Sequence, residues 1–218
     1  MLQSVHVAVM RRALGDLFAS HALHSIIAAN VEVDALWNQV GHDELHFDNN
    51  AFDRSYAYIA GQRALIRPAL EAGQPPRAWR AFGRLTHTAQ DFYSHTNYVG
   101  LWLESRADGL VPEPNGIDPL DSSLVESPSL RSGKPYLPFG ALSFVPGIAN
   151  LVDRLLPEDS HARMHLDSAA RGPAFEFAFH AAVKRTQLEY DLSVNGLPES
   201  LAGEFRGFSA PSAYRQGI

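Results

Sequence analysis

Apolar residues along this chain recur mainly at intervals of three and four, the spacing of a helix with one buried face. No stretch alternates apolar and polar positions as a half-buried strand would, so the pattern predicts an all-α fold. The expected helices cover residues 4–20, 23–39, 51–72, 77–95, about 146–156 and 173–192. Pro68 should bend or split the third helix, and Pro75 and Pro76 should open the fourth.

The helical spacing is interrupted by a long insert from about residue 101 to residue 157, where Pro, Gly and Ser cluster. A loop of this length inside a compact domain is usually a functional lid or binding loop, or is disordered. Its scattered large apolar residues favour a packed cover: Leu110, Val111, Tyr136, Leu137, Phe139 and Phe144. The tail after Gly196 is expected to be irregular. We therefore expect one multi-helix domain over residues 1–218 with an irregular insert.

Composition narrows the classes of partner. The net charge of -6 gives no general attraction to nucleic acid or anionic lipid, so no stable nucleic-acid partner is expected. A local basic patch or bound cations would have to provide such attraction. Because there is no cysteine, any metal must be held by His, Asp, Glu, backbone or water.

No apolar run approaches the length of a membrane span, although a peripheral contact with a membrane is compatible with the sequence. The first residues, MLQSVHVAVMRRALGDLF, lack the long apolar region of a secretory signal. The expectation is a cytoplasmic protein or one exported without this kind of leader.

The strongest chemical signal is the stretch GRLTHTAQDFYSHTNYV, residues 83–99. It places His87, Asp91 and His95 at successive intervals of four, which puts them on one face of a helix. Neutral imidazole and carboxylate are good ligands for zinc and similar divalent metals. Taken alone, this trio could equally be a polar stripe of hydrogen-bonded histidines.

Other segments supply further candidate ligands, which favours the metal interpretation. They are His6, Asp34, His46 and the group His161, His165 and Asp167. A purely structural helix bundle has no reason to gather imidazoles in several separate segments, whereas a multinuclear site between facing helices requires it. His21 and His24 are expected at the surface or as caps, and His180 in the core. His42 could either orient a ligand or lie on a surface loop.

The stretch LTHTAQDFYSHTNYV resembles the H-x-x-x-Q-D-F-x-S-H-S-N motif of the heterokaryon-incompatibility C (Het-C) family. That family is similar in turn to bacterial zinc-dependent phospholipases C and to fungal zinc nucleases for single strands. The resemblance covers residues 4–99 and about 160–190. It implies an all-helical domain that holds two or three Zn²⁺ ions and hydrolyses phosphodiesters.

The resemblance also implies roles for individual residues. HVAVMRRAL, ANVEVDAL and LHFDNN are similar to the segments that supply a zinc histidine, a carboxylate and a further histidine, which points to His6, Asp34 and His46. His87 and Asp91 match the central pair whose carboxylate bridges two metals, and His95 begins the set for the remaining metal.

HARMHLDS stands where the family closes that last set, with His161 as one ligand and either His165 or Asp167 as its partner. The glutamate usual in the phospholipases is missing at this place. A third ion would then be held loosely, or Asp48 or Glu44 would be recruited. The phospholipases also use their processed N-terminal residue as a ligand, and no tryptophan is present here to fill that place.

The chemistry expected from such a site is hydrolysis of a phosphoric ester by a metal-activated water, with Asp34 and Asp91 as catalytic carboxylates and Asp34 as a candidate general base. The apolar insert favours a phospholipid and a phospholipase C reaction, because a strand-binding groove would need basic residues beside stacking aromatics. A zinc nuclease is the alternative within this class. A Het-C-like toxin or self-recognition protein with structural metal, and a helical interaction domain without metal, are alternatives from other classes.

Overall fold

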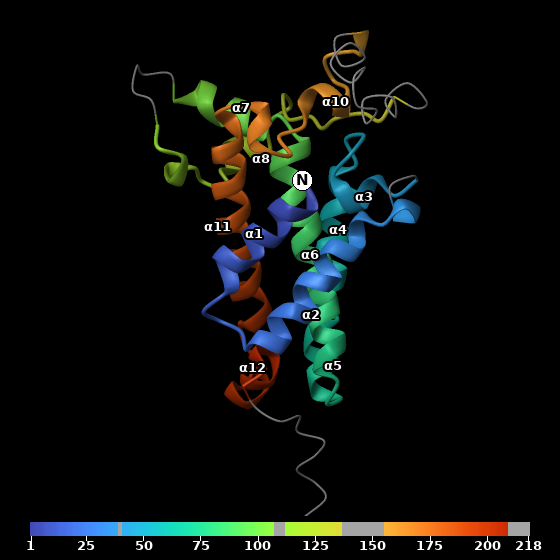
Figure 1. Cartoon of the computed structure of the whole chain (residues 1–218), viewed down its shortest axis with the longest axis vertical. Helices are drawn as coiled ribbons and strands as arrows, with labels where there is room; N and C mark the ends of the chain where they lie inside the picture. The colour runs from blue at the N-terminus through green and yellow to red at the C-terminus, as the bar shows by residue number, and fades with distance from the viewer. Residues whose placement is uncertain (39–40, 107–111, 137–154, 209–218) are drawn as a thin grey trace, which may run out of the picture.

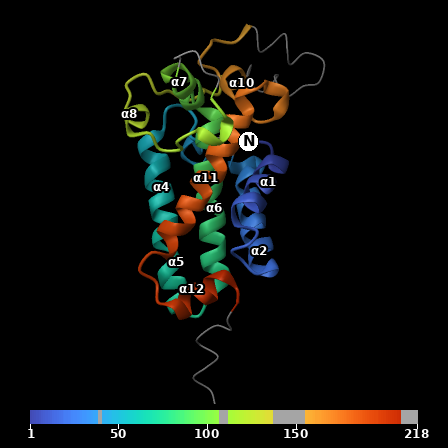
Figure 2. The ribbon, with the colours of Figure 1, turned by 90° about the vertical axis from the view of Figure 1, so that its left-hand side faces the viewer.

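The protein is organised around one long central helix, α6 (Pro75–His95), in a computed structural model that describes residues 1–38, 41–106, 112–136 and 155–208. Helices α2, α4, α5 and α11 all pack against α6. Figures 1 and 2 show α4, α6 and α11 running along the long axis, with α7, α8 and α10 at one end and α5 and α12 at the other. The described residues form no strand, only two isolated bridges between extended segments. The all-α prediction is confirmed.

The described helices and 3₁₀ turns follow one another along the chain. They are α1 (Gln3–Leu14), α2 (Ser20–Val31), η1 (Glu32–Asp34), η2 (Leu36–Asn38), α3 (Asp43–His46), α4 (Phe52–Ala64), α5 (Ile66–Glu71), α6, α7 (Tyr98–Ser105), η3 (Pro114–Gly116), α8 (Ser122–Val125), α10 (His161–Met164), η5 (Ala169–Arg171), α11 (Ala174–Val194) and α12 (Glu199–Arg206).

Helix α6 is buried on all sides along its second half, where even its polar side chains have lost contact with water. Its apolar residues, such as Phe82, Leu85 and Phe92, belong to one core cluster that also draws on α1, α2, α4 and α11. Polar groups removed from water must find partners inside the protein. The burial of α6 therefore forces its histidines and its aspartate to contact side chains from the surrounding helices.

Helices α2 and α6 cross at a glycine. A Cβ atom at Gly83 would lie 2.3 Å from the backbone oxygen of Ile26 and 2.8 Å from the Cβ of Ala29. Only the absence of a side chain lets the two backbones approach this closely. The crossing matters for the site because α2 leads directly into the turn that carries Asp34.

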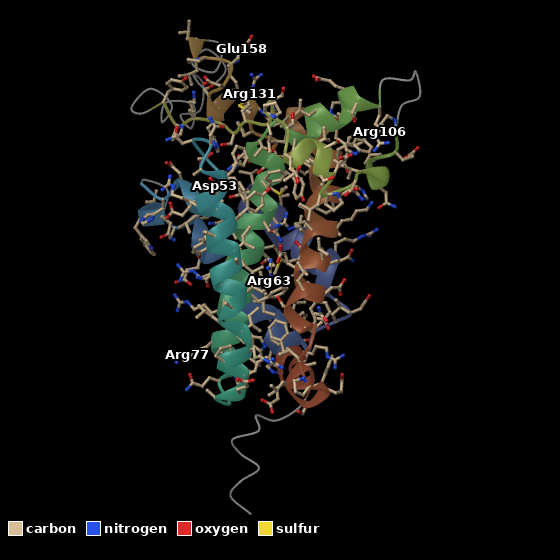
Figure 3. The ribbon with its side chains drawn as sticks, turned by 180° about the vertical axis from the view of Figure 1, so that it is seen from behind. Asp53, Arg63, Arg77, Arg106, Arg131 and Glu158 are labelled. Atoms are coloured by element: carbon tan, nitrogen blue, oxygen red, sulfur yellow. The ribbon has the colours of Figure 1, made fainter. Side chains whose placement is uncertain are left out.

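A buried ion group ties α4 to α11 on the other side of α6. Glu189, which is fully buried, accepts hydrogen bonds from Arg185 Nε at 2.8 Å and from Arg63 Nε at 3.1 Å. Arg63 reaches it from α4, in the middle of the view in Figure 3. The pairing neutralises a carboxylate that would otherwise be costly to bury.

The helix predictions hold for the main segments, with differences at their ends. The third predicted helix is split as expected: α4 ends at Ala64, whose carbonyl oxygen would meet the ring of Pro68 in a continuous helix. The second predicted helix is shorter than expected, because the chain leaves α2 at Val31 for two 3₁₀ turns. The expected helix near 146–156 lies largely outside the described residues.

Two irregular segments contain helices that the spacing did not reveal. Helix α7 extends into the predicted insert. The described part of the insert also contains η3 and α8. Residues 107–111 and 137–154 of the insert lie outside the described residues. The tail expected to be irregular contains α12, where Phe205 is buried and its carbonyl oxygen accepts a hydrogen bond from Trp79 Nε1 at 2.7 Å. An eight-residue helix like this depends on tertiary packing.

No helix in the described part of the chain is both long enough and apolar enough to cross a membrane.

The crossing at Gly83 gives a direct test of the fold. Gly83→Ala should lower the free energy of unfolding by about 1–3 kcal/mol, because the added methyl group forces α2 away from α6. Gly61→Ala is the matched control, since Gly61 lies inside α4 with open space around it and should gain roughly 0.5–1 kcal/mol. Urea denaturation measures both. Equal effects of the two substitutions would contradict this account of the crossing.

Candidate metal centre

The predicted ligands meet at one end of the bundle, around the last three turns of α6. His87, Asp91 and His95 point from α6 toward side chains that arrive from five other segments. These segments are the first turns of α1, the η1 turn after α2, the short helix α3, helix α10 and the residues that follow α10. In Figure 1 this region surrounds the start of α1, below α10.

Asp91 lies in the middle of the cluster and is fully buried. Its Oδ2 atom lies 3.0 Å from His46 Nδ1 and 3.0 Å from His87 Nε2. Its Oδ1 atom faces the other way, 3.2 Å from His6 Nε2. One carboxylate thus presents one oxygen to His46 and His87 and the other to His6, an arrangement compatible with a carboxylate that bridges two metal ions.

The first set has the dimensions of a metal site. His87 Nε2 lies 3.2 Å from His46 Nδ1, and both are 3.0 Å from Asp91 Oδ2. Ligands bound at 2.0–2.1 Å to a tetrahedral zinc ion lie about 3.3–3.4 Å from one another. Asp34 Oδ1 lies 3.7 Å from His87 Nε2, and Asp34, His6 and His87 form an overlapping group of possible ligands. A small adjustment would therefore fit a divalent ion among these side chains.

A second region lies on the other side of Asp91. His95 Nδ1 donates a hydrogen bond to the backbone oxygen of His46 at 2.8 Å, which leaves Nε2 directed at Asp167 Oδ1, 3.3 Å away. His161 Nδ1 is 2.9 Å from Asp48 Oδ1. Asp48, His95 and His161 form a third possible ligand group. This region contains the ligands expected for the last metal.

The structure bears on the alternatives left open for that last metal. Asp167 Oδ1 faces His95, whereas Asp167 Oδ2 is 3.0 Å from His165 Nδ1, so Asp167 lies between His165 and the cluster. Asp48 also reaches the cluster. Glu44 does not, because it pairs with Arg54 and His42 on the surface. The geometry favours Asp167 and Asp48 over His165 and Glu44.

The amino group of Met1 lies among the carboxylates. It donates hydrogen bonds to Asp91 Oδ1 and to Ser94 Oγ, and it is 3.3 Å from Asp167 Oδ1. Burial disfavours its charge, but the nearby carboxylates outweigh burial and raise the pKa of the amino group to about 11. The ammonium group thus offsets part of the negative charge of Asp91 and Asp167.

The histidines differ in how their surroundings act on protonation. Burial, followed by the neighbouring charge of His6, keeps the pKa of His87 well below its ordinary value. For His46 and His161, burial also opposes protonation, but the carboxylates of Asp91 and Asp48 outweigh it and raise the pKa of each. A histidine that stays neutral keeps a lone pair available for a metal ion.

The carboxylates also separate into two kinds. Burial favours their neutral form, but nearby positive charges hold the pKa values of Asp91, Asp167 and Asp48 below the usual range. Asp34 is the exception, because burial and the charge of Asp91 raise its pKa. A carboxylate with a raised pKa at the partly exposed edge of the cluster suits the predicted role of Asp34 as a general base.

A turn in unusual backbone conformation presents His46 and Asp48. Phe47, Asn49 and Asn50 all have positive φ angles, near +55°. Such angles are strained for a residue like Phe, whose ring is fixed here by packing against Phe92. Strained residues of this kind gather at functional sites, where the surrounding structure holds them in place.

The described part of the insert forms one wall of the site. Gly133 N donates to the backbone oxygen of His95 at 2.8 Å, and Gly133 O accepts from Asn49 N at 2.8 Å. A Cβ atom at Gly133 would lie 2.6 Å from the Cα of His161, so glycine allows this strand-like segment to pass directly beside α10. The apolar residues on which the prediction of a packed cover rests lie, apart from Tyr136, outside the described residues, so the cover stays a prediction.

The remaining histidines lie outside the cluster. His21 and His24 are exposed, His180 is half-buried beside Phe179, and His42 is at the surface. Sequence reasoning gave no role to Gln90 or Ser94, which contact His6 and the Met1 amino group inside the site. Gln90 could have been noticed as a polar residue directly before Asp91 in the sequence.

The fold and this site define an all-α domain with buried histidine and aspartate groups whose possible ligand atoms lie within 4.8 Å of one another. Residues 1–120 match the model of the VWA7 N-terminal domain family, and the chain belongs to that family. The match includes every candidate ligand from His6 to His95 and ends before His161. No curated protein and no solved structure matches the chain.

The lowered pKa of His87 predicts a pH dependence of stability in metal-free protein. The unfolded chain protonates His87 near its ordinary value of 6.5, while the folded protein does not. The contribution of His87 to the free energy of unfolding is therefore fully present above pH 6.5. This contribution should be lost as pH falls, by up to about 1.4 kcal/mol per pH unit. His87→Asn should weaken this dependence.

Urea denaturation in chelator between about pH 8 and about pH 5.5 measures the effect. His24→Asn makes the same change at an exposed histidine and should leave the pH dependence as in the wild type. An unchanged dependence in His87→Asn would refute the assignment.

Proposed function

We propose that this protein is a zinc-dependent phosphoric ester hydrolase that acts on a phospholipid in the manner of a phospholipase C. The observation that carries the proposal is the position of Asp91, whose Oδ2 contacts His46 and His87 and whose Oδ1 contacts His6. Paired metal ions bridged by a carboxylate are typical of enzymes that hydrolyse phosphoric esters. The resemblance to the Het-C and phospholipase C families supports the same chemistry.

The residues would share the work between binding and proton transfer. His6, His46, His87 and Asp91 would hold two ions, and His95, His161 and Asp167 a third, with Asp34 and Asp48 at the exposed edge. Bound ions would supply positive charge for the phosphate and a water of lowered pKa. Asp34, with its raised pKa, would accept the proton of the attacking water.

The side of the cluster open to solvent supports access for a substrate. Asp34, Asp48 and Asp167 keep about 15% of their side-chain surface exposed, whereas Asp91 and His87 keep none. Substrate would therefore approach past the outer carboxylates. The protein needs no nucleophilic serine or cysteine for this reaction, because water is the nucleophile.

Two exposed apolar side chains beside Asp34 support a lipid substrate. Leu36 is 85% exposed and Trp37 is 74% exposed, and both belong to the η2 turn that follows Asp34. Exposed tryptophan next to an active site is suited to the interface between lipid and water, where its ring has an apolar and a polar side. This placement favours a peripheral contact with a membrane over a groove for a nucleic-acid strand.

The proposal predicts that Asp91→Asn removes both metal and activity. The wild type should carry two or three zinc ions per chain after preparation without chelator, and it should hydrolyse phosphatidylcholine vesicles. The variant should lose bound zinc and at least about 100-fold of the turnover, beyond the 10–100-fold typical of residues that only support a ligand. Mass spectrometry of metal content and release of phosphocholine measure the two effects.

Asp53→Asn is the matched control, because Asp53 is exposed near the start of α4 (Figure 3). It should keep metal and turnover. Metal without turnover on lipid or single-stranded nucleic acid would instead favour a structural metal, as in a toxin-like or self-recognition role. Turnover on nucleic acid alone would favour the nuclease.

The membrane contact predicts a difference between substrates. The double substitution Leu36→Ser with Trp37→Ser should reduce turnover on vesicles by roughly tenfold or more, since each side chain forfeits about 1.5 kcal/mol or more of apolar contact. It should leave turnover on a soluble phosphodiester unchanged. Leu65→Ser, at an exposed leucine away from the cluster, should affect neither. Equal losses on both substrates would count against the membrane contact.

A further inference from the structure

The ring of His6 is held at one nitrogen only. His6 Nδ1 lies 2.6 Å from Gln90 Oε1. His6 Nε2 is buried without a hydrogen-bond partner among the described residues, 3.2 Å from Asp91 Oδ1. Both His6 and Gln90 are fully buried, so water does not choose between the two ring nitrogens. The position of the imidazole proton therefore depends on which end of the Gln90 amide faces His6.

A threonine on α11 fixes one end of that amide. Gln90 Nε2 lies 2.9 Å from Thr186 Oγ1. The hydroxyl of Thr186 already donates to the backbone oxygen of Ala182 at 2.8 Å, so it can only accept from Gln90. The group facing Thr186 must then be the NH₂ group.

An asparagine on α2 fixes the other end. Asn30 Nδ2 lies 3.3 Å from Gln90 Oε1 and 3.2 Å from Thr86 Oγ1. The hydroxyl of Thr86 donates to the backbone oxygen of Gly83 at 2.9 Å, so it too must accept from Asn30. Asn30 therefore presents donors, and the group of Gln90 that it meets must be the oxygen. Two independent contacts from two helices require the same orientation of the amide.

We propose that Gln90 is a positioning residue that keeps the imidazole proton of His6 on Nδ1 and leaves the lone pair of Nε2 directed into the metal centre. The inference rests on the proposed metal site and adds to it the means by which one ligand is prepared. Gln90 oxygen accepts from Nδ1–H, Thr186 and Asn30 hold Gln90, and their own partners are backbone carbonyls and Thr86. The chain of hydrogen bonds ties the ligand to α2 and α11.

The hydrogen bond from His6 to Gln90 is needed because Asp91 competes for the imidazole proton of His6. In neutral imidazole a single proton sits on one nitrogen, and the carboxylate oxygen 3.2 Å from Nε2 is a strong acceptor. With the proton on Nε2, His6 could not bind a metal through that atom. The close oxygen of Gln90 makes this tautomer unfavourable, since two lone pairs would then face each other at 2.6 Å.

The test combines three substitutions. Gln90→Met keeps the length of the side chain and removes its acceptor. Thr186→Val removes the hydroxyl that orients Gln90, and Thr186→Ser restores it. Two readouts apply: nitrogen NMR of the His6 ring in chelator-treated protein at alkaline pH, and the zinc affinity measured by competition with a chromophoric chelator.

In the wild type and in Thr186→Ser, the proton should be on Nδ1. In Gln90→Met it should move to Nε2, and the affinity of the zinc site that includes His6 should fall by about 10- to 100-fold. Thr186→Val should move both readouts in the same direction to a smaller degree. If Gln90→Met does not fold, the comparison of Thr186→Val with Thr186→Ser still tests the inference.

Two results would overturn the inference: a proton on Nε2 in the wild type, or unchanged tautomer and affinity in both Gln90→Met and Thr186→Val. Neither readout uses turnover. A protein that binds zinc through His6 but hydrolyses no phosphoric ester would refute the proposed function and leave this inference standing.

Discussion

The arrangement of the surrounding segments depends on a single buried carboxylate, that of Asp91. A charged group removed from water is costly unless opposite charge or hydrogen-bond donors surround it. Here His6, His46, His87 and the Met1 amino group contact its two oxygens from three other segments and from α6 itself. The bundle can therefore close around α6 only when α1, α3 and the following segments bring these groups to the same place.

The packing of the helices places the candidate ligands close to one another. The close crossing at Gly83 fixes α2 against α6, and α2 then releases the chain into the turn that carries Asp34. The strained turn after α3 brings the backbone oxygen of His46 and the carboxylate of Asp48 to the same ring nitrogen of His95. The insert segment at Gly133 holds α10 beside the end of α6. Structural features with no chemical role of their own thus determine the geometry of the candidate centre.

The side chains of the centre differ in how much of their surface solvent can reach. His46, His87 and Asp91 lie inside, and Asp34, Asp48 and Asp167 lie at the partly exposed edge. Such a gradient suits a site that holds cations firmly inside and meets a phosphate from outside. The exposed Leu36 and Trp37 next to Asp34 extend the same direction of approach toward an apolar surface.

The sequence by itself determined the features that depend on local geometry: the helical class, the split near Pro68, and one face of α6 with His87, Asp91 and His95. The spacing of a helix fixes these relations whatever surrounds it. Histidines and aspartates in other segments supplied the remaining candidate ligands, and the resemblance gave them roles. The choices between Asp167 and His165, and between Asp48 and Glu44, stayed open. Tertiary structure favoured Asp167 and Asp48, revealed Gln90 beside His6, and formed α12, because these contacts join segments whose distances depend on packing alone.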